Sequence, residues 1–118
     1  MPNPTVKSTS LKTVSFDRMA DMTLNDAKII TDHYEAHESE DVVTQVLGLL
    51  HQLKGPTFGY QIDRFDHSLQ CATRALRNGE PDEIVVAALL HDVGESIAPW
   101  NHSAVAAEIL KPYVEERT

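Results

Sequence analysis

The feature that most constrains this chain is an apolar run that stops abruptly on two ligand-type side chains. Seven consecutive apolar residues, Ile84 to Leu90, are followed at once by His91 and Asp92. A helix that is apolar on every face is typical of the buried centre of a bundle. A buried carboxylate without a partner is costly, and a cation is a common remedy. The run therefore predicts a central helix whose last turn leads into a metal-type site.

The rest of the chain also carries helical signals, and no segment shows the alternation typical of a strand. The expected helices begin after Thr23, at Ser39 or Glu40, at Ile62, at Pro81 and after Asn101. Glycine and proline residues between these starts supply the breaks, because neither continues a helix well. Thr23 and Asp26 also have the spacing of a weak capping box, and Asn101 is expected to cap the last helix. The pattern predicts an all-α bundle of about five helices.

The expected third helix, from Ile62 to Asn78, has two different faces. Its main apolar stripe, expected to face the core, consists of Ile62, Phe65, Leu69, Ala72 and Leu76. His67 lies nearly opposite this stripe and borders a face of small residues, Cys71 and Ala75. The helix could be sandwiched between neighbours, but the spacing alone does not force His67 to point inward.

Length, charge and cysteine usage narrow the class of protein. The chain has 118 residues and a formal net charge of -8, which fits one small acidic domain and disfavours nucleic acid or an anionic membrane as a partner. Its single cysteine allows no internal disulfide, which fits a reducing compartment. No apolar run approaches the roughly 18 residues of a spanning helix, and no secretory signal pattern is seen. We expect a cytoplasmic protein with a small-molecule substrate, and a homodimer is compatible with the sequence.

The chain is expected to divide into an arm and one helical domain. Residues 1–20 are rich in Pro, Ser and Thr and are expected to be disordered, and residues 21–118 form the helical domain. Within it, the metal-site core is expected over about 60–114.

Histidines on three successive expected helices point to a metal site. His67, His91 and His102 belong to the third, fourth and fifth helices, and Asp92 adjoins His91. Imidazole and carboxylate together suit divalent transition metals. An adjacent His–Asp pair is useful because the histidine can hold one ion while the carboxylate bridges to a second, about 3.5–4 Å away. We therefore expect these four side chains to converge.

The motifs around these residues resemble those of a known family. "HDVGE" after an apolar helix, with "DHSLQCA" upstream and "WNHSAVAAEIL" downstream, is similar to the HD-domain superfamily of metal-dependent phosphohydrolases. The closer likeness is to small HD-domain oxygenases, relatives in mechanism of myo-inositol oxygenase, that cleave organophosphonates with a mixed-valent di-iron centre. The likeness covers roughly 60–114. It implies an HD-type helical bundle, and because the family draws a further His and Asp from later helices, it implies a bundle truncated at the C-terminus.

The resemblance also assigns roles to particular residues. It implies that His67, His91 and Asp92 bind a first metal, that Asp92 bridges, and that His102 binds a second. The implied cofactor is two iron ions, with Mn, Mg, Co or Zn as alternatives. Asp92 and Glu95 are the candidate catalytic residues.

Substrate contacts are expected near the same site. Tyr60, Asp63 and Arg64 are weaker candidates for binding substrate; Arg64 is otherwise expected at the surface. Many relatives carry Lys or His at the position of Glu95, where it helps hold phosphate, so a carboxylate there would repel phosphate unless a metal or an arginine intervenes.

Three functions remain open from the sequence. The favoured one is oxidative cleavage of a small polar substrate such as an organophosphonate; the alternatives are a metal-dependent phosphohydrolase and a non-catalytic or degenerate HD-type module. Outside the main site, His33 and His37 have i, i+4 spacing but are expected on a solvated acidic face. Cys71, one turn from His67, is expected to be an inert packing residue rather than a nucleophile.

Overall fold

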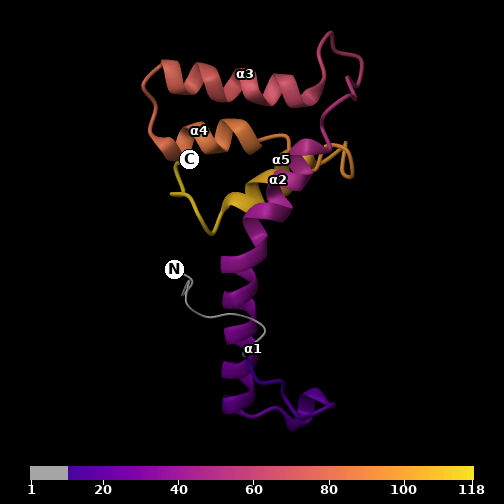
Figure 1. The fold of residues 1–118 in the computed structure, drawn as a ribbon, viewed down its shortest axis with the longest axis vertical. Helices are drawn as coiled ribbons and strands as arrows, with labels where there is room; N and C mark the ends of the chain where they lie inside the picture. Colours follow the sequence, from indigo (N-terminus) through magenta and orange to yellow (C-terminus); the bar gives the residue numbers. More distant parts are fainter. Residues whose placement is uncertain (1–10) are drawn as a thin grey trace. The chain divides into compact units, whose positions relative to one another are not determined.

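The computed structural model describes residues 11–118, and the chain divides into two compact units, Met1–Gln45 and Val46–Thr118. The described part is helical and contains no strand, which confirms the all-α class (Figure 1). Part of the expected N-terminal arm, residues 1–10, lies outside the described residues, so the arm stays a prediction. Among residues 11–118, no helix is both long and apolar enough to cross a lipid bilayer.

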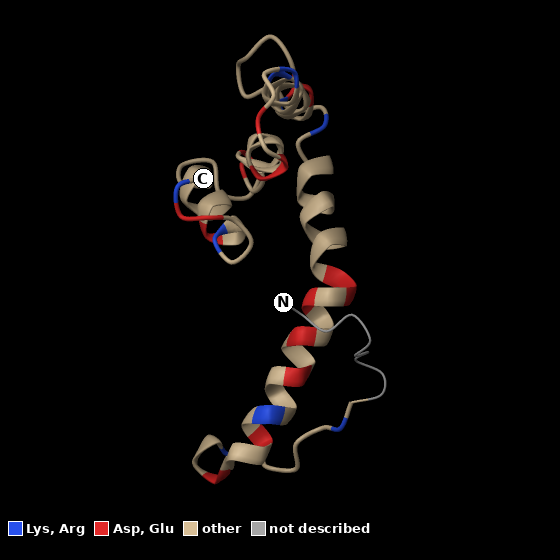
Figure 2. Ribbon diagram, turned by 90° about the vertical axis from the view of Figure 1, so that its left-hand side faces the viewer, with Lys and Arg blue, Asp and Glu red and all other residues tan. Residues whose placement is uncertain are grey.

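The first unit is dominated by helix α1 (Leu24–His37), preceded by a short 3₁₀ turn, η2 (Met19–Asp21). The capping box is confirmed: the Asp26 amide donates to Thr23 Oγ1 at 3.2 Å, and the Thr23 amide donates to Asp26 Oδ2 at 2.9 Å. No break occurs near Ser39, because a π-helical stretch, η3 (Glu38–Val42), continues the helical turns from α1. Acidic residues follow one another along α1 and η3, as Figure 2 shows.

The second unit contains the end of helix α2 and three further helices. The helices are α2 (Val43–His51), α3 (Arg64–Arg77), α4 (Asp82–Leu90) and α5 (His102–Leu110). Figure 1 shows α3 and α4 lying side by side, joined by a short connection. That connection includes Gly79, whose φ of +77° is one that L side chains rarely adopt, so the predicted stop after Asn78 is confirmed. Asn101 occupies the N-cap of α5, but its side chain makes no capping hydrogen bond there.

The core of the second unit is small and lies where α2, α4 and α5 meet. Its buried members are Leu50, Leu53, Leu90, Val93 and Ala106. Partly buried side chains complete it: Val46, Leu49, Phe65, Leu89, Ile109 and Leu110. Because Leu90 and Val93 are core residues, the turn that carries His91 and Asp92 is anchored from both sides by apolar packing.

The stripe expected to face the core on α3 does so only in part, because Phe65 packs against the core while other members of the stripe are exposed. Leu69 and Leu76 of the apolar stripe are exposed, Leu76 by 63%, whereas Arg64 and Ser68 are buried. Small residues such as Ser68 let α3 approach α4 closely, and Ser68 satisfies its hydroxyl by donating to the Arg64 carbonyl at 2.9 Å. The ion pairs that Arg64 makes across this face compensate for its burial.

Helix α4 is less central than its composition predicts. Leu90 is its only buried residue, and Val86 is 43% exposed. Helix α3 covers α4 more extensively than any other helix does. Val86 of α4 instead borders a surface depression, which Tyr113 and Val114 also line. Within the described residues the apolar run is therefore packed by α3 and by the core at Leu89 and Leu90, but it is not covered on all sides.

Gly94 is predicted to be required in the turn after α4. Its φ is +88°, and an added Cβ would lie 3.1 Å from Val105 Cγ1 on α5. We expect Gly94→Ala to lower the free energy of unfolding by about 1–3 kcal/mol, because it adds backbone strain to a close contact. The measurement is urea unfolding. Gly48→Ala is the matched control: Gly48 lies in α2 with open space around it, so alanine should stabilise by about 0.5–1 kcal/mol. Equal effects at both positions would contradict the argument.

Candidate metal centre

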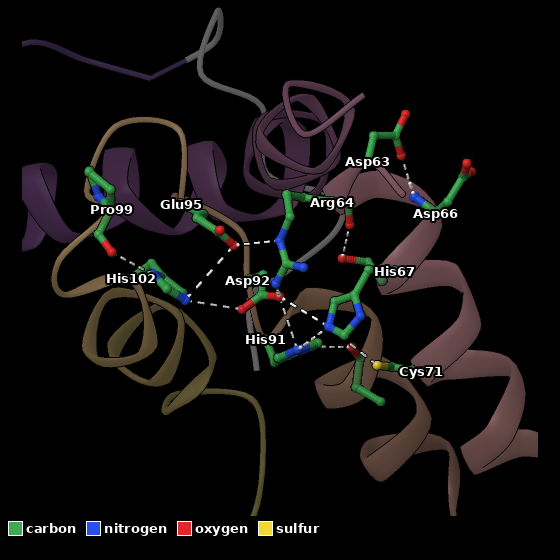
Figure 3. A network of polar contacts seen from close by, with 12 residues as sticks. Asp63, Arg64, Asp66, His67, Cys71, His91, Asp92, Glu95, Pro99 and His102 are labelled. Carbon is green, nitrogen blue, oxygen red and sulfur yellow. Dashed lines mark hydrogen bonds and ion pairs between the residues drawn. The ribbon is translucent and has the colours of Figure 1, made fainter. Parts of the chain in front are cut away.

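The predicted site residues come together in the second unit from three parts of the chain. Helix α3 supplies one group, the turn after α4 supplies the next, and the first residue of α5 supplies the last (Figure 3). We call this set the His–carboxylate cluster: His67, His91, Asp92, Glu95 and His102.

Asp92 lies at the centre of the His–carboxylate cluster and divides its two oxygens between two groups of ligands. Its Oδ2 lies 3.1 Å from His91 Nε2 and 3.4 Å from His67 Nε2. Its Oδ1 lies 3.2 Å from His102 Nε2. The convergence that the sequence predicted is therefore present, and the two Asp92 oxygens face imidazoles from different parts of the chain.

Backbone carbonyls hold two of the imidazoles in a ligand-ready orientation. His91 Nδ1 lies 2.6 Å from the Ala88 carbonyl, and His102 Nδ1 lies 2.9 Å from the Pro99 carbonyl. A carbonyl only accepts, so these contacts assign the ring proton to Nδ1 and leave the Nε2 lone pair facing Asp92. Such a second contact is what normally orients a metal-binding histidine.

The surroundings of His67 favour its neutral form. Burial lowers the pKa of His67 below its ordinary value of 6.5, and the nearby Arg64 guanidinium lowers it further. The Asp92 carboxylate acts in the opposite direction but is outweighed. A neutral imidazole keeps a lone pair free, as metal binding requires.

Arg64 is the main participant that sequence reasoning misplaced. It is not at the surface but 7% exposed, and its Nη2 donates to Asp92 Oδ2 at 2.8 Å while its Nε donates to Glu95 Oε2 at 3.1 Å. The two acids are 3% and 6% exposed. One guanidinium thus balances two buried carboxylates, which leaves a formal charge of -1 when the imidazoles are neutral. The sequence did contain a signal for this placement: Arg64 precedes His67 by three residues, and residues with that spacing lie on the same face of a helix.

The spacing of the donor atoms fits a metal ion. Bonds of about 2.0–2.2 Å at angles between about 90° and 110° place neighbouring ligand atoms about 2.8–3.6 Å apart. The atoms His67 Nε2, His91 Nε2 and Asp92 Oδ2 form a triangle with edges of 3.3, 3.4 and 3.1 Å. All three edges lie in that range, so one ion above the triangle could touch every corner.

A second position lies on the other side of Asp92. His102 Nε2 is 3.2 Å from Asp92 Oδ1, within the same range, and 3.9 Å from Glu95 Oε2. Donor atoms of these three residues all lie within 4.8 Å of one another. Glu95 is engaged by Arg64, so its availability as a ligand depends on that ion pair.

The weaker substrate candidates lie beside the His–carboxylate cluster and have structural contacts of their own. The Tyr60 ring stacks on Arg64, with 4.4 Å between the ring centroid and Cζ. Asp63 is the N-cap of α3, where Oδ1 accepts from the Asp66 amide at 2.8 Å and Oδ2 accepts from the Gly55 amide at 2.9 Å. A role for Tyr60, Asp63 or Arg64 in substrate binding stays a prediction.

Asp63 is expected to stabilise α3 in a pH-dependent way. The hydrogen bond from the Asp66 amide, followed by that from Gly55, lowers its pKa below the ordinary value of 3.8. A folded-state pKa below the unfolded value stabilises fully above about pH 4 and is lost as the pH falls through the folded-state pKa. Asp63→Ala should therefore lower Tm by several degrees at pH 7, with a smaller difference from wild type near pH 3. Thermal unfolding across pH checks this, and a difference that does not depend on pH would contradict it.

The remaining histidines of the described residues and the cysteine each have a different contact. His33 Nε2 lies 2.6 Å from the Lys12 carbonyl, and His37 pairs with Asp41 at 3.2 Å, so each has its own partner rather than sharing an ion. His51 stacks on Phe65 with ring centroids 5.5 Å apart. Cys71 is half-buried, and its Sγ lies 3.6 Å from His67 Nε2.

Comparison with known proteins agrees with this geometry. The family described as "HD domain" matches residues 64–117, the segment that supplies every member of the His–carboxylate cluster. The chain is 30% identical over 88 residues to the "Multifunctional CCA protein" of Hahella chejuensis (strain KCTC 2396), covering 69% of this chain and 21% of that protein. It is 35% identical over 66 residues to the "[1-hydroxy-2-(trimethylamino)ethyl]phosphonate dioxygenase (glycine-betaine-forming)" of Leisingera caerulea, covering 47% of this chain and 34% of that protein. The chain thus spans about a fifth and a third of these relatives. No solved structure matches it.

Proposed function

Residues 64–117 form an HD domain, as the resemblance predicted, and from that premise we propose that the protein is a metal-dependent enzyme that oxidatively cleaves a small organophosphonate. The His–carboxylate cluster would hold two iron ions on either side of Asp92. The single observation that carries the proposal is the position of Asp92, whose two oxygens each lie 3.1–3.4 Å from imidazole nitrogens of different helices or turns.

The charge of the His–carboxylate cluster supports a bound cation. Two buried carboxylates face one guanidinium, which leaves one negative charge without a partner among these three side chains. An uncompensated charge in a buried site is costly, and a divalent ion would offset it while filling the space that the imidazole lone pairs face.

The ligand types favour iron and an oxygenase. Two imidazoles and one carboxylate on a single triangular face are the donor set of non-haem Fe(II) oxygenases. One of the relatives is named as a phosphonate dioxygenase, which supports the same choice. When bound, iron supplies the one-electron redox chemistry that oxidative carbon–phosphorus cleavage needs.

Arg64 would adapt the site to an anionic substrate. It holds Asp92 and Glu95 through separate nitrogens, so both carboxylates stay oriented. Its charge also neutralises Glu95, the residue whose carboxylate would otherwise repel a phosphonate group. The sequence predicted that Glu95 would repel phosphate unless a metal or an arginine intervened, and Arg64 is an arginine in that position.

Hydrolysis of a phosphate ester is the second candidate, and the place of Glu95 favours it. Its buried carboxylate lies 3.9 Å from His102 Nε2, next to the second ion position. A carboxylate there can take a proton from water that attacks a phosphoryl group. In this version the ions would polarise the phosphoryl oxygen and no oxidant would be needed.

Metal content and oxygen uptake together test the proposal. The full chain is purified without added metal, analysed for elements, and assayed with small phosphonates in an oxygen electrode. About two equivalents of iron with substrate-dependent oxygen consumption would support the oxygenase. Hydrolysis of generic phosphate esters with Mn, Mg, Co or Zn, and no oxygen uptake, would overturn it in favour of the hydrolase. Absence of any ion above background, even after incubation with each, would contradict both and leave a non-catalytic helical module.

A further inference from the structure

We propose that Cys71 joins His67 and His91 as a ligand of the ion on their side of the His–carboxylate cluster, and that its thiolate makes this position select thiophilic ions. The inference rests on the proposed function, because it requires that a metal ion binds at this position. It adds a ligand outside the residues that the family resemblance implies, and it specifies the class of metal.

The position of the sulfur relative to the imidazoles carries the proposal. Cys71 Sγ lies 3.6 Å from His67 Nε2, and donor atoms of Cys71, His67 and His91 all lie within 4.8 Å of one another. A metal–sulfur bond of about 2.3 Å and a metal–nitrogen bond of about 2.0–2.1 Å at a tetrahedral angle place the two donors about 3.6 Å apart. One ion can therefore touch both atoms with no change in their separation.

The local structure explains why the sulfur faces the imidazoles. Cys71 follows His67 by four residues in α3, so both side chains lie on one helix face. This is the face that turns toward α4, where His91 follows the last turn, and Figure 3 shows Cys71 beside His67 and His91. Cys71 is half-buried, and the expectation of an inert packing role stays a prediction that the experiment below decides.

A thiolate changes which ions the site prefers. Soft sulfur ligands favour thiophilic ions such as Zn²⁺, whereas carboxylate, carbonyl and water oxygens suit Mg²⁺ and Mn²⁺ better. Binding would release the thiol proton to solvent as the metal–sulfur bond forms. The chain should thus discriminate against Mg²⁺ and Mn²⁺ at this position.

Cobalt spectroscopy of the full chain tests the proposal directly. Metal-free protein is titrated with Co²⁺ under anaerobic, reducing conditions, and a thiolate-to-cobalt charge-transfer band should appear in the near ultraviolet. Because Cys71 is the only cysteine among the 118 residues, any such band must come from it. The band should vanish in Cys71→Ser and Cys71→Ala. It should persist in the control Thr73→Ser, an exposed position on the same helix whose hydroxyl bonds the Leu69 carbonyl.

Metal competition gives the second readout. Cys71→Ser should lower Zn²⁺ affinity by at least about 10-fold, since loss of an outer-shell partner alone costs that much, while Mn²⁺ affinity changes less than about 2-fold. Visible cobalt bands without the near-ultraviolet band would overturn the role of Cys71 and leave the metal site intact. Failure to bind Co²⁺ at all would overturn the proposed metal centre and this inference with it. The wild-type band needs no variant, so poor folding of a Cys71 variant does not prevent a decision.

Discussion

In the proposed metal centre, Asp92→Asn is expected to lose both ions, because Asp92 is the one side chain shared by the two positions. An amide has a single acceptor oxygen and no charge, so it can replace neither the bridging geometry nor the negative charge. Loss of an outer-shell partner alone costs about 10–100-fold in metal affinity, so removal of this ligand should cost more than about 100-fold. Activity should fall by at least about 1,000-fold, which corresponds to the several kcal/mol that a metal contributes to a transition state.

Metal content and fold are measured together to test this result. Elemental analysis and isothermal titration report the ions, and far-ultraviolet circular dichroism reports helix content, which should be unchanged because Arg64 still pairs with Glu95. Glu108→Gln, which alters an exposed carboxylate on α5, is the control and should bind metal as wild type does. An Asp92→Asn protein that keeps two equivalents of metal would refute the central place of Asp92.

Arg64→Met should be the most destabilising single change in the metal-free protein. Methionine keeps much of the apolar stem but removes the guanidinium that both buried carboxylates share. Breaking a buried ion pair from one side costs about 3–5 kcal/mol, because the remaining charge stays buried without compensation. Urea unfolding in the presence of chelator measures the loss. Arg74→Met, at an exposed arginine of the same helix, should change stability by no more than about 0.5 kcal/mol.

Two further measurements identify the cause of that loss. Adding Glu95→Gln to Arg64→Met should recover part of the stability, since one uncompensated carboxylate disappears with it. Saturating Zn²⁺ should stabilise Arg64→Met more than wild type, because the ion then provides the positive charge that Arg64 supplied. A loss below about 1 kcal/mol in the metal-free variant would show that the ion pairs do not hold the site together.

The candidate metal ligands could be predicted without tertiary information, because the signals for them are short stretches of sequence. His91 and Asp92 are adjacent in sequence, so their proximity was assured wherever the helix packed. His67 and His102 were predicted as ligands because the motifs around them resemble those of HD domains. The family match over residues 64–117 confirms that resemblance. Local signals also located the capping box at Thr23 and the stop after Asn78, because caps and stops depend on a few neighbouring residues.

The direction in which α3 faces could not be predicted from its pattern. An apolar stripe marks a face of the helix, but burial of that face requires another element to cover it, and Leu69 and Leu76 have no such cover among the described residues. The most buried residues of α3, Arg64 and Ser68, lie beside this stripe, because the small Ser68 permits close approach and Arg64 finds two carboxylates 28 and 31 residues later in the chain. Burial of a charge depends entirely on such long-range partners.

The amino-acid sequence by itself determined the helical class, most helix ends and the identity of the candidate metal ligands, because each follows from residues close together in the chain or from a motif. Only the tertiary structure decided that Arg64 balances Asp92 and Glu95, that Asp92 directs its two oxygens to different imidazoles, and that Cys71 lies beside His67. These arrangements depend on distances between side chains of different elements. Such distances are set by how close α3, α4 and α5 pack, a property that no single segment carries.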